Sequence, residues 1–196
     1  METESIYGDN LPAMEATINV VLQAMDKLRQ DMTERYGSDP VEHCLGRIKS
    51  EESMREKCRR QQIPETEQSA LEIIHDAIGI RIVCAFISDV YAVRDYLETI
   101  DGMEVVEEKD YIKHAKPNGY RSLHMILRYR DRYYVEIQIR TISMDTWAAL
   151  EHHMRYKKEA GSNDALITAE LKRCADELAS TDMSMQTIRD MIRAEI

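Results

Sequence analysis

The chain has 196 residues, of which 43% are hydrophobic and 32% charged, a composition that suits one folded domain and excludes a largely disordered protein. The formal net charge of −10 argues against broad attraction to DNA or to anionic membranes, because both are polyanions. We therefore expect a single domain over residues 1–196, with neither DNA nor a membrane as partner. A local basic pocket for a small anion is compatible with this charge.

The cysteines and the first residues indicate a reduced, cytoplasmic protein. The four cysteines form no CxxC pair, and Cys84 lies inside an apolar run where a buried, inert thiol is expected. The first ten residues show no basic-then-apolar leader, and no apolar run approaches the length of a membrane span.

The first third of the chain is predicted to be helical. Apolar residues recur at three- and four-residue steps over 11–37, which predicts a long helix ended by Gly37. A short connection then leads to a strongly charged helix that begins near Ser50 and stops at Pro64. Thr66 is the expected N-cap of another helix.

The middle of the chain alternates between strand and helix patterns. The run 78–87 is almost continuously apolar and β-branched, which predicts a strand buried on both faces. A helix over 89–100 follows. Three more strands are expected, the last two paired in a hairpin across Arg130-Asp131: 103–111, 120–130 and 133–141. This mixed order predicts an α+β fold whose mixed sheet is flanked by helices.

Two helices are expected at the C-terminal end. The first covers 144–158 and is closed by Lys157, Lys158 and Gly161. The second begins near Asn163 and carries apolar residues seven apart: Leu171, Leu178, Met185 and Ile192. This seam fits either packing on the chain's own sheet or self-association.

Several polar residues stand out against this apolar framework. In the strand 133–141, alternation places Glu136, Gln138 and Arg140 on one face, which must meet water, another chain or a polar cleft. Asp76 precedes a buried strand, where a carboxylate often holds a metal or caps a neighbour. Arg81 is unusual inside an apolar run, because arginine is rarely buried unless it is paired or stacked.

Cations concentrate in two stretches of this acidic chain. Residues 47–60 contain six lysines and arginines, which form either a solvated charged helix or a phosphate site. Residues 109–125 gather further cations with histidines and tyrosines around a Pro-Asn-Gly turn. No GxxxxGK[ST], GxGxxG or HExxH motif is present, which disfavours P-loop, dinucleotide-binding and zinc-hydrolase classes.

Five motifs in order carry a resemblance to a known family: "GRIKSEES", "HDAIGIRIVCAF", "EEKDYIKHAKPNGYRSLH", "VEIQIRTISMDTWAALEH" and "YKK". Over Gly46 to Lys158 the chain resembles the RelA/SpoT synthetases, and in its short length their single-domain branch, the small alarmone synthetases. The resemblance implies a nucleotidyltransferase-like sheet of about five strands. It also implies transfer of the β,γ-pyrophosphate of ATP to the 3′-hydroxyl of GDP or GTP. The 45 residues before Gly46 leave no room for a phosphohydrolase domain, so product hydrolysis is not expected.

The resemblance also implies roles for particular residues. Arg47 and Arg81 would sandwich adenine, and the ATP triphosphate would meet Lys49, Ser53, Lys57 and Arg60. Tyr120 would stack on guanine, and the rest of the GDP or GTP site would comprise Lys109, Lys116, Asn118, His124, Gln138 and Glu151. Asp76 and Glu136 would hold Mg²⁺, and Glu136 would also orient or deprotonate the 3′-hydroxyl.

Other interpretations stay open at this point. The acceptor could be AMP, ADP or the 3′ end of tRNA, or the protein could be a regulator that binds single-stranded RNA and alarmone. Members of the branch commonly form homotetramers, for which the C-terminal seam is suited. His114-Ala115 replaces the Asn-Pro of many relatives, a change expected to loosen the acceptor loop.

Overall fold

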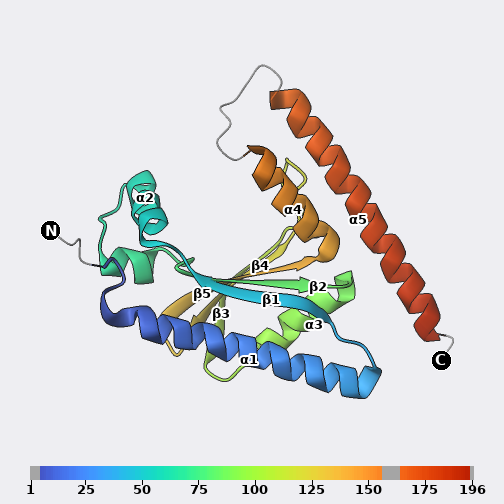
Figure 1. Cartoon of the computed structure of the whole chain (residues 1–196), viewed down its shortest axis with the longest axis horizontal. Helices are drawn as coiled ribbons and strands as arrows, with labels where there is room; N and C mark the ends of the chain where they lie inside the picture. Colours follow the sequence, from blue (N-terminus) through green and yellow to red (C-terminus); the bar gives the residue numbers. More distant parts are fainter. Residues whose placement is uncertain (1–4, 156–163, 195–196) are drawn as a thin grey trace.

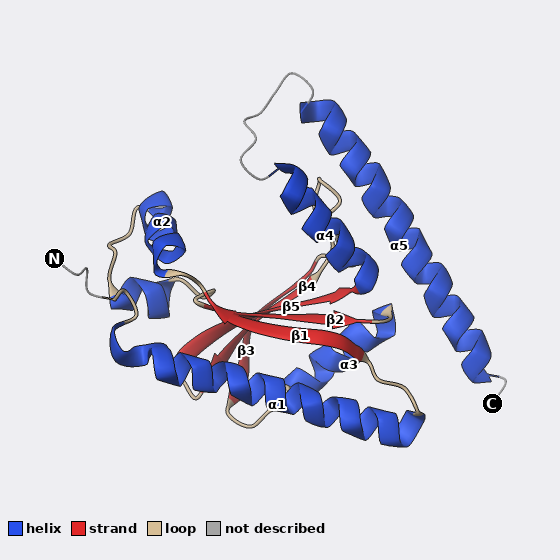
Figure 2. Cartoon of the chain, viewed as in Figure 1, coloured by secondary structure: helices blue, strands red, loops and turns tan. Residues whose placement is uncertain are grey.

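The computed structural model describes residues 5–155 and 164–194. A mixed five-stranded sheet lies at its centre, with strand order β1-β2-β5-β4-β3 and helices on both sides (Figures 1 and 2). β2 and β5 run parallel, and the other neighbouring strands are antiparallel. The strands are β1 (Val41–Ile48), β2 (Ile78–Cys84), β3 (Met103–Asp110), β4 (Leu123–Tyr129) and β5 (Tyr133–Thr141). The predicted α+β class with a mixed sheet is confirmed.

The helices begin and end close to the predicted positions. They are α1 (Leu11–Tyr36), α2 (Glu51–Gln61), α3 (Ile87–Leu97), α4 (Ile142–Arg155) and α5 (Asp164–Ala194). Gly37 ends α1 in the left-handed region at φ 64°, where a glycine avoids the strain of a Cβ. The Ser50 hydroxyl accepts the Ser53 N–H and caps α2. The predicted closure of α4 by Lys157, Lys158 and Gly161 falls outside the described residues.

The helix predicted after Thr66 is short and irregular. Its main part is a π-helical turn over Ser69–Ile73, and the Thr66 hydroxyl accepts the Ser69 N–H at its start. Along the described ranges 5–155 and 164–194, no helix has both the length and the apolar character needed to cross a membrane.

The edge strand β1 was predicted as part of a connection. Its side chains are mostly exposed, so the segment lacks the apolar alternation by which strands are recognised in sequences. It pairs antiparallel with β2, with Gly46 opposite Ile80. A Cβ at Gly46 would lie 2.3 Å from Cγ2 of Ile18, so only glycine lets α1 pack this closely over β1.

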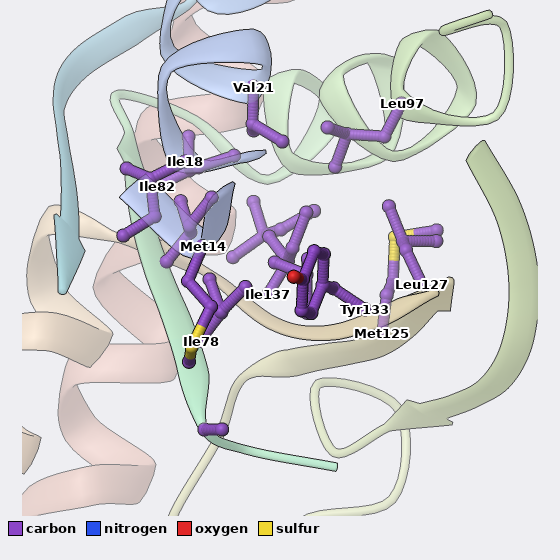
Figure 3. Packing of buried hydrophobic residues seen from close by; sticks show 14 of the residues in the cluster. Met14, Ile18, Val21, Ile78, Ile82, Leu97, Met125, Leu127, Tyr133 and Ile137 are labelled. Carbon is purple, nitrogen blue, oxygen red and sulfur yellow. The ribbon is translucent and has the colours of Figure 1, made fainter. Parts of the chain in front are cut away.

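One face of the sheet is sealed by α1 and α3 and forms the core (Figure 3). Val135, Ile137 and Ile139 of β5 are fully buried there, as the alternation in the sequence predicted. Met14 and Val21 of α1 pack into the same cluster. This face positions β2 and β5 rigidly side by side.

The prediction that β2 is buried on both faces is wrong for part of one face, on which only Val83 is buried. Ile80 and Ile82 are buried, but Gly79 and Arg81 are only half-buried. They point to the opposite side of the sheet from the core, where they line a pocket together with Glu136 and Gln138.

The long helix α5 packs mainly against other helices. Near its start, Leu171 packs against Trp147 of α4, and the indole Nε1 donates to the Leu171 carbonyl at 2.8 Å. Farther along, Arg189 forms a buried ion pair with Asp89 of α3 at 2.7 Å. Met185 and Ile192 of the predicted seam are 48% and 56% exposed, and Ile188 between them is 50% exposed, so this half of the helix has an apolar outer face.

Candidate functional site

The polar face of the sheet lies on the side away from α1 and α3, where α2 and α4 stand (Figure 2). Strand register aligns its side chains in rows across the sheet. Arg81, Gln138, His124 and Lys109 are consecutive neighbours in one such row. Glu136 lies in the adjacent row, beside Gly79, where the missing side chain leaves space in front of the carboxylate.

Asp76 lies just before β2, between two lysines. Its Oδ2 accepts from Lys49 Nζ at 2.5 Å and from Lys57 Nζ at 2.6 Å. Burial tends to raise the pKa of this carboxyl, but the hydrogen bonds and charges of the two lysines outweigh burial and hold the pKa below its usual value. Asp76 is therefore ionised at neutral pH.

The other oxygen of Asp76, Oδ1, is buried and has no hydrogen-bond partner. A buried carboxylate oxygen without a partner is costly and suits a cation that the structure does not contain. In the part of the chain that is described, no cluster of three or more His, Cys, Asp or Glu side chains could hold a metal alone. The donor set thus fits an ion that takes one or two carboxylates and completes its shell with phosphate and water, as Mg²⁺ does.

Glu136 lies close enough to Asp76 for the two charges to interact. The pKa of Glu136 is held below its usual value first by its interaction with His124, against burial and the negative charge of Asp76. His124 Nδ1 is 3.7 Å from Glu136 Oε1, and Gln138 Nε2 donates to Oε2 at 3.1 Å. The two acids, far apart in the sequence, thus converge at one end of the polar face.

Two pockets lie on the polar face, and Glu136 lines the smaller of them. The smaller, of about 170 Å³, is lined by Leu45, Gly46, Arg47, Gly79, Ile80, Arg81, Glu136 and Gln138. The larger, of about 430 Å³, is lined by Arg47, Arg81, Tyr120, Arg140, Ala148, Ala149, Glu151, His152 and His153. Because both include Arg47 and Arg81, these arginines lie where the pockets meet. The arginines predicted to flank adenine, and the predicted Gln138, Glu151 and Tyr120, therefore line one continuous region.

Of the residues predicted for the triphosphate, three lie on α2 and the fourth, Lys49, lies just before it. Lys57 and Lys49 reach Asp76, whereas Ser53 and Arg60 are exposed. Ser53 precedes Lys57 by four residues and Arg60 follows it by three, so all three share a helix face. The charged helix α2 is thus more than a solvated surface element, because its Lys57 contacts Asp76.

The predicted acceptor loop forms the turn that its Asn-Gly pair indicated. Gly119 has φ 94°, and the Asn118 side-chain oxygen accepts the Tyr120 N–H at 3.2 Å. The Tyr120 hydroxyl lies 2.7 Å from His124 Nε2. Lys116 Nζ lies 4.9 Å from the Tyr120 ring centre, so a cation approaches this aromatic surface. Lys109 is farther out and pairs with Glu107 at 2.8 Å.

Arg140 and Asp145 belong to the site, although neither was predicted to act in it. Arg140 is only 5% exposed and donates to the Tyr120 hydroxyl and to Gln138 Oε1, both at 2.7 Å. It also pairs with Asp145 at 3.0 Å. Alternation already placed Arg140 on the polar face, so the signal for it was present. Asp145 carried no such signal, because its partners come from other elements.

Aromatic contacts also support the acidic centre. The His75 ring, adjacent to Asp76, stacks on Tyr134 with 3.8 Å between ring centres and 19° between planes. Tyr134 lies two residues before Glu136 on the same face of β5, so the stack connects the segments that carry the two acids. Tyr7, which is buried, donates its hydroxyl to the Lys49 carbonyl at 2.7 Å. Neither of these two contacts was predicted.

The fold and the site together define a mixed sheet whose polar face carries two converging acids with lysines and arginines around them. Residues 46–161 match the family described as a region found in RelA/SpoT proteins, and the chain belongs to this family. The resemblance seen in the motifs is thereby confirmed.

Named relatives support the same assignment. The chain is 38% identical to the GTP pyrophosphokinase YwaC of Bacillus subtilis over 193 residues, which cover 94% of this chain and 87% of that protein. It is 35% identical to the GTP pyrophosphokinase YjbM of the same organism, over 79% of this chain and 74% of that protein. Small alarmone synthetase 1 from Bacillus subtilis, bound to its product pppGpp, superposes with a TM-score of 0.79 at 30% identity, covering 94% of this chain and 96% of that one.

Proposed function

We propose that this protein is a GTP pyrophosphokinase that transfers the β,γ-pyrophosphate of ATP to the 3′-hydroxyl of GDP or GTP. The products are AMP and ppGpp or pppGpp. The names of the two Bacillus subtilis relatives support this function, as does the solved relative bound to pppGpp. Within the chain itself, the observation that carries the proposal is the convergence of Asp76 and Glu136 on a face that holds two pockets, both lined by Arg47 and Arg81.

The chemistry is an in-line displacement at the β-phosphorus of ATP. The 3′-oxygen of the acceptor forms a bond to Pβ, the bond between Pβ and the oxygen bridging to the α-phosphate breaks, and AMP leaves with that oxygen. Glu136, ionised at neutral pH, accepts a hydrogen bond from the attacking hydroxyl. The same carboxylate orients the hydroxyl and is the group placed to take up its proton.

Positive charge at the transferred group comes from the chain and from a divalent metal. Lys49 and Lys57 already lie at Asp76, so both reach the region where the phosphates would lie. Asp76, through its free Oδ1, and Glu136 would hold Mg²⁺. When bound, Mg²⁺ neutralises charge on the pyrophosphoryl group.

The two nucleotides would occupy the two ends of the polar face. Arg47 and Arg81 would flank adenine, since guanidinium planes stack well on bases. The ATP phosphates would meet Lys49, Ser53, Lys57 and Arg60. Tyr120 would stack on guanine, and the acceptor site would be completed by Lys109, Lys116, Asn118, His124, Gln138 and Glu151.

A thin-layer assay with ATP labelled at the γ-phosphate tests this function. The protein would be offered GDP, GTP, ADP and tRNA separately, each with and without Mg²⁺. We expect label in ppGpp and pppGpp only, and only with Mg²⁺. Label in ADP-derived product or in tRNA, with none in guanine nucleotides, would show that the acceptor is not GDP or GTP. Binding of single-stranded RNA without any transfer would favour the alternative that the protein is an RNA-binding regulator.

Nucleotide substrates of this kind are consistent with action in the cytoplasm.

We further propose a homotetramer that uses the apolar outer face of α5. Leu178 is a poor probe because it packs partly against the chain's own Trp147 cluster, whereas Ile192 is 56% exposed. Light scattering should show a smaller mass for Ile192→Glu than for the wild type. An unchanged mass would remove this face from the interface.

A further inference from the structure

Asp145 lies in the first turn of α4 and contacts two arginines through a single oxygen. Its Oδ1 is 3.0 Å from Arg140 Nη1 and 3.5 Å from Arg81 Nη1. Arg81 lines both pockets and is proposed to flank adenine, whereas Arg140 lines the larger pocket together with Tyr120, the residue proposed to stack on guanine. One carboxylate therefore connects the two halves of the site.

Arg140 carries this connection to the aromatic ring of the acceptor pocket. Its Nη2 donates to both the Tyr120 hydroxyl and Gln138 Oε1 at 2.7 Å. The Tyr120 hydroxyl in turn contacts His124, which lies beside Glu136. The contacts thus run without a break from the donor arginine to the acceptor tyrosine and on to the acidic centre.

We infer that Asp145 is a positioning residue shared by both nucleotide pockets. A guanidinium stacks on or donates to a ligand at a lower entropic cost when its plane is already fixed, and a carboxylate partner fixes that plane. Among the described residues, Asp145 is the one acid in ion-pair contact with Arg140 or Arg81. This inference rests on the proposed function, since it assumes that Arg81 contacts ATP and that Tyr120 contacts the acceptor nucleotide.

The two arms of the connection differ in strength. The Arg140 side chain is 6% exposed and forms the shorter contact, whereas that of Arg81 is 43% exposed and forms the longer one. Solvent screens the Arg81 pair, so removing the negative charge matters less on that side. Loss of the charge should therefore weaken acceptor binding more than donor binding.

Calorimetric titration of Asp145→Asn with GDP and, separately, with a non-hydrolysable ATP analogue tests the inference. We expect GDP to bind about tenfold more weakly and the ATP analogue about threefold more weakly than to the wild type. Glu177→Gln is the matched control, because it removes an exposed carboxylate of α5 that pairs with Arg173. Both of its affinities should equal those of the wild type.

A second variant separates positioning from a general loss of structure. Arg140→Lys keeps the charge but loses the two-sided contact with Tyr120 and Gln138, while the Arg81–Asp145 pair is left intact. It should bind GDP about tenfold more weakly and the ATP analogue as the wild type does. Thermal unfolding of each variant shows whether it is folded at the titration temperature.

Two outcomes would overturn the inference. One is wild-type affinity of Asp145→Asn for both ligands. The other is an equal loss of both affinities in Arg140→Lys, which would indicate a disturbed fold. If the wild-type protein bound neither nucleotide, the proposed function itself would fail, and that result is visible before any variant is compared.

Discussion

The two faces of the central sheet are built from the same strands and differ in almost every physical respect. On one face, Val135, Ile137 and Ile139 are fully buried under α1 and α3. On the other face, Glu136 and Gln138 lie between them in the sequence and remain half-buried beside pockets. Packing on the core face holds the strands in place. The polar face can therefore carry charged side chains that contribute little to the stability of the fold.

The largest expected effect is a loss of pyrophosphate transfer when either acid of the polar face is removed. Asp76→Ala and Glu136→Ala should each lower pyrophosphate transfer by about 10³-fold or more, because electrostatic stabilisation at the reacting group is lost. Thermal unfolding should still be cooperative, since neither side chain belongs to the core cluster. The thin-layer assay measures the transfer. Turnover near that of the wild type in either variant would contradict the site.

The second effect is a loss of stability when a buried side chain of the core face is shortened. Ile137→Ala should lower the free energy of unfolding by about 2–5 kcal/mol, because the truncation leaves a cavity in a fully buried position. Urea titration measures this change. Ile73→Ala, at a position 53% exposed in the π-helical turn, is the control and should change the free energy of unfolding by less than about 0.5 kcal/mol. Equal losses in the two variants would contradict the assignment of the core face.

The third effect concerns the aromatic surface of the acceptor pocket. Tyr120→Ala should raise the KM for GDP by about tenfold or more, since stacking on a base contributes about 1–3 kcal/mol. The KM for ATP should stay within about twofold of the wild-type value, a free-energy change of about 0.4 kcal/mol. Tyr120→Phe keeps the ring and loses only the hydroxyl contacts with His124 and Arg140, so its effect should be smaller. Equal changes in both KM values for Tyr120→Ala would argue against a guanine-stacking role.

The smallest expected effect is a pH dependence at the start of the acceptor loop. Burial tends to raise the pKa of Asp110, but hydrogen bonds from Lys113, Tyr91 and Ile112 outweigh burial and hold the pKa below its ordinary 3.8. A carboxyl whose pKa is lowered in the folded state adds stability above its ordinary value. That stability is lost as the pH falls through the lower, folded value.

Urea unfolding of the wild type and of Asp110→Asn at pH 6 and pH 3 would measure this contribution. The wild type should be the more stable protein at pH 6, and the difference should narrow at pH 3 as Asp110 takes up a proton. A difference that is independent of pH would show that charge at Asp110 has no part in it.

The sequence by itself determined the elements whose pattern is local. Helix periodicity, Gly37 and Ser50 located α1 and α2, and alternation in β5 separated a core face from a polar one. These predictions succeeded because caps and periods depend on residues a few positions apart. The motifs added the family and the residues expected to act.

Only the tertiary structure decided which distant residues meet. β1 is an exposed edge strand that owes its existence to pairing with β2 and to the close packing of α1 over Gly46. Asp145 joins Arg81 and Arg140 because the first turn of α4 folds back over the ends of β2 and β5. Such contacts depend on how helices and strands pack against one another. A pattern that repeats over a few residues contains no information about that packing.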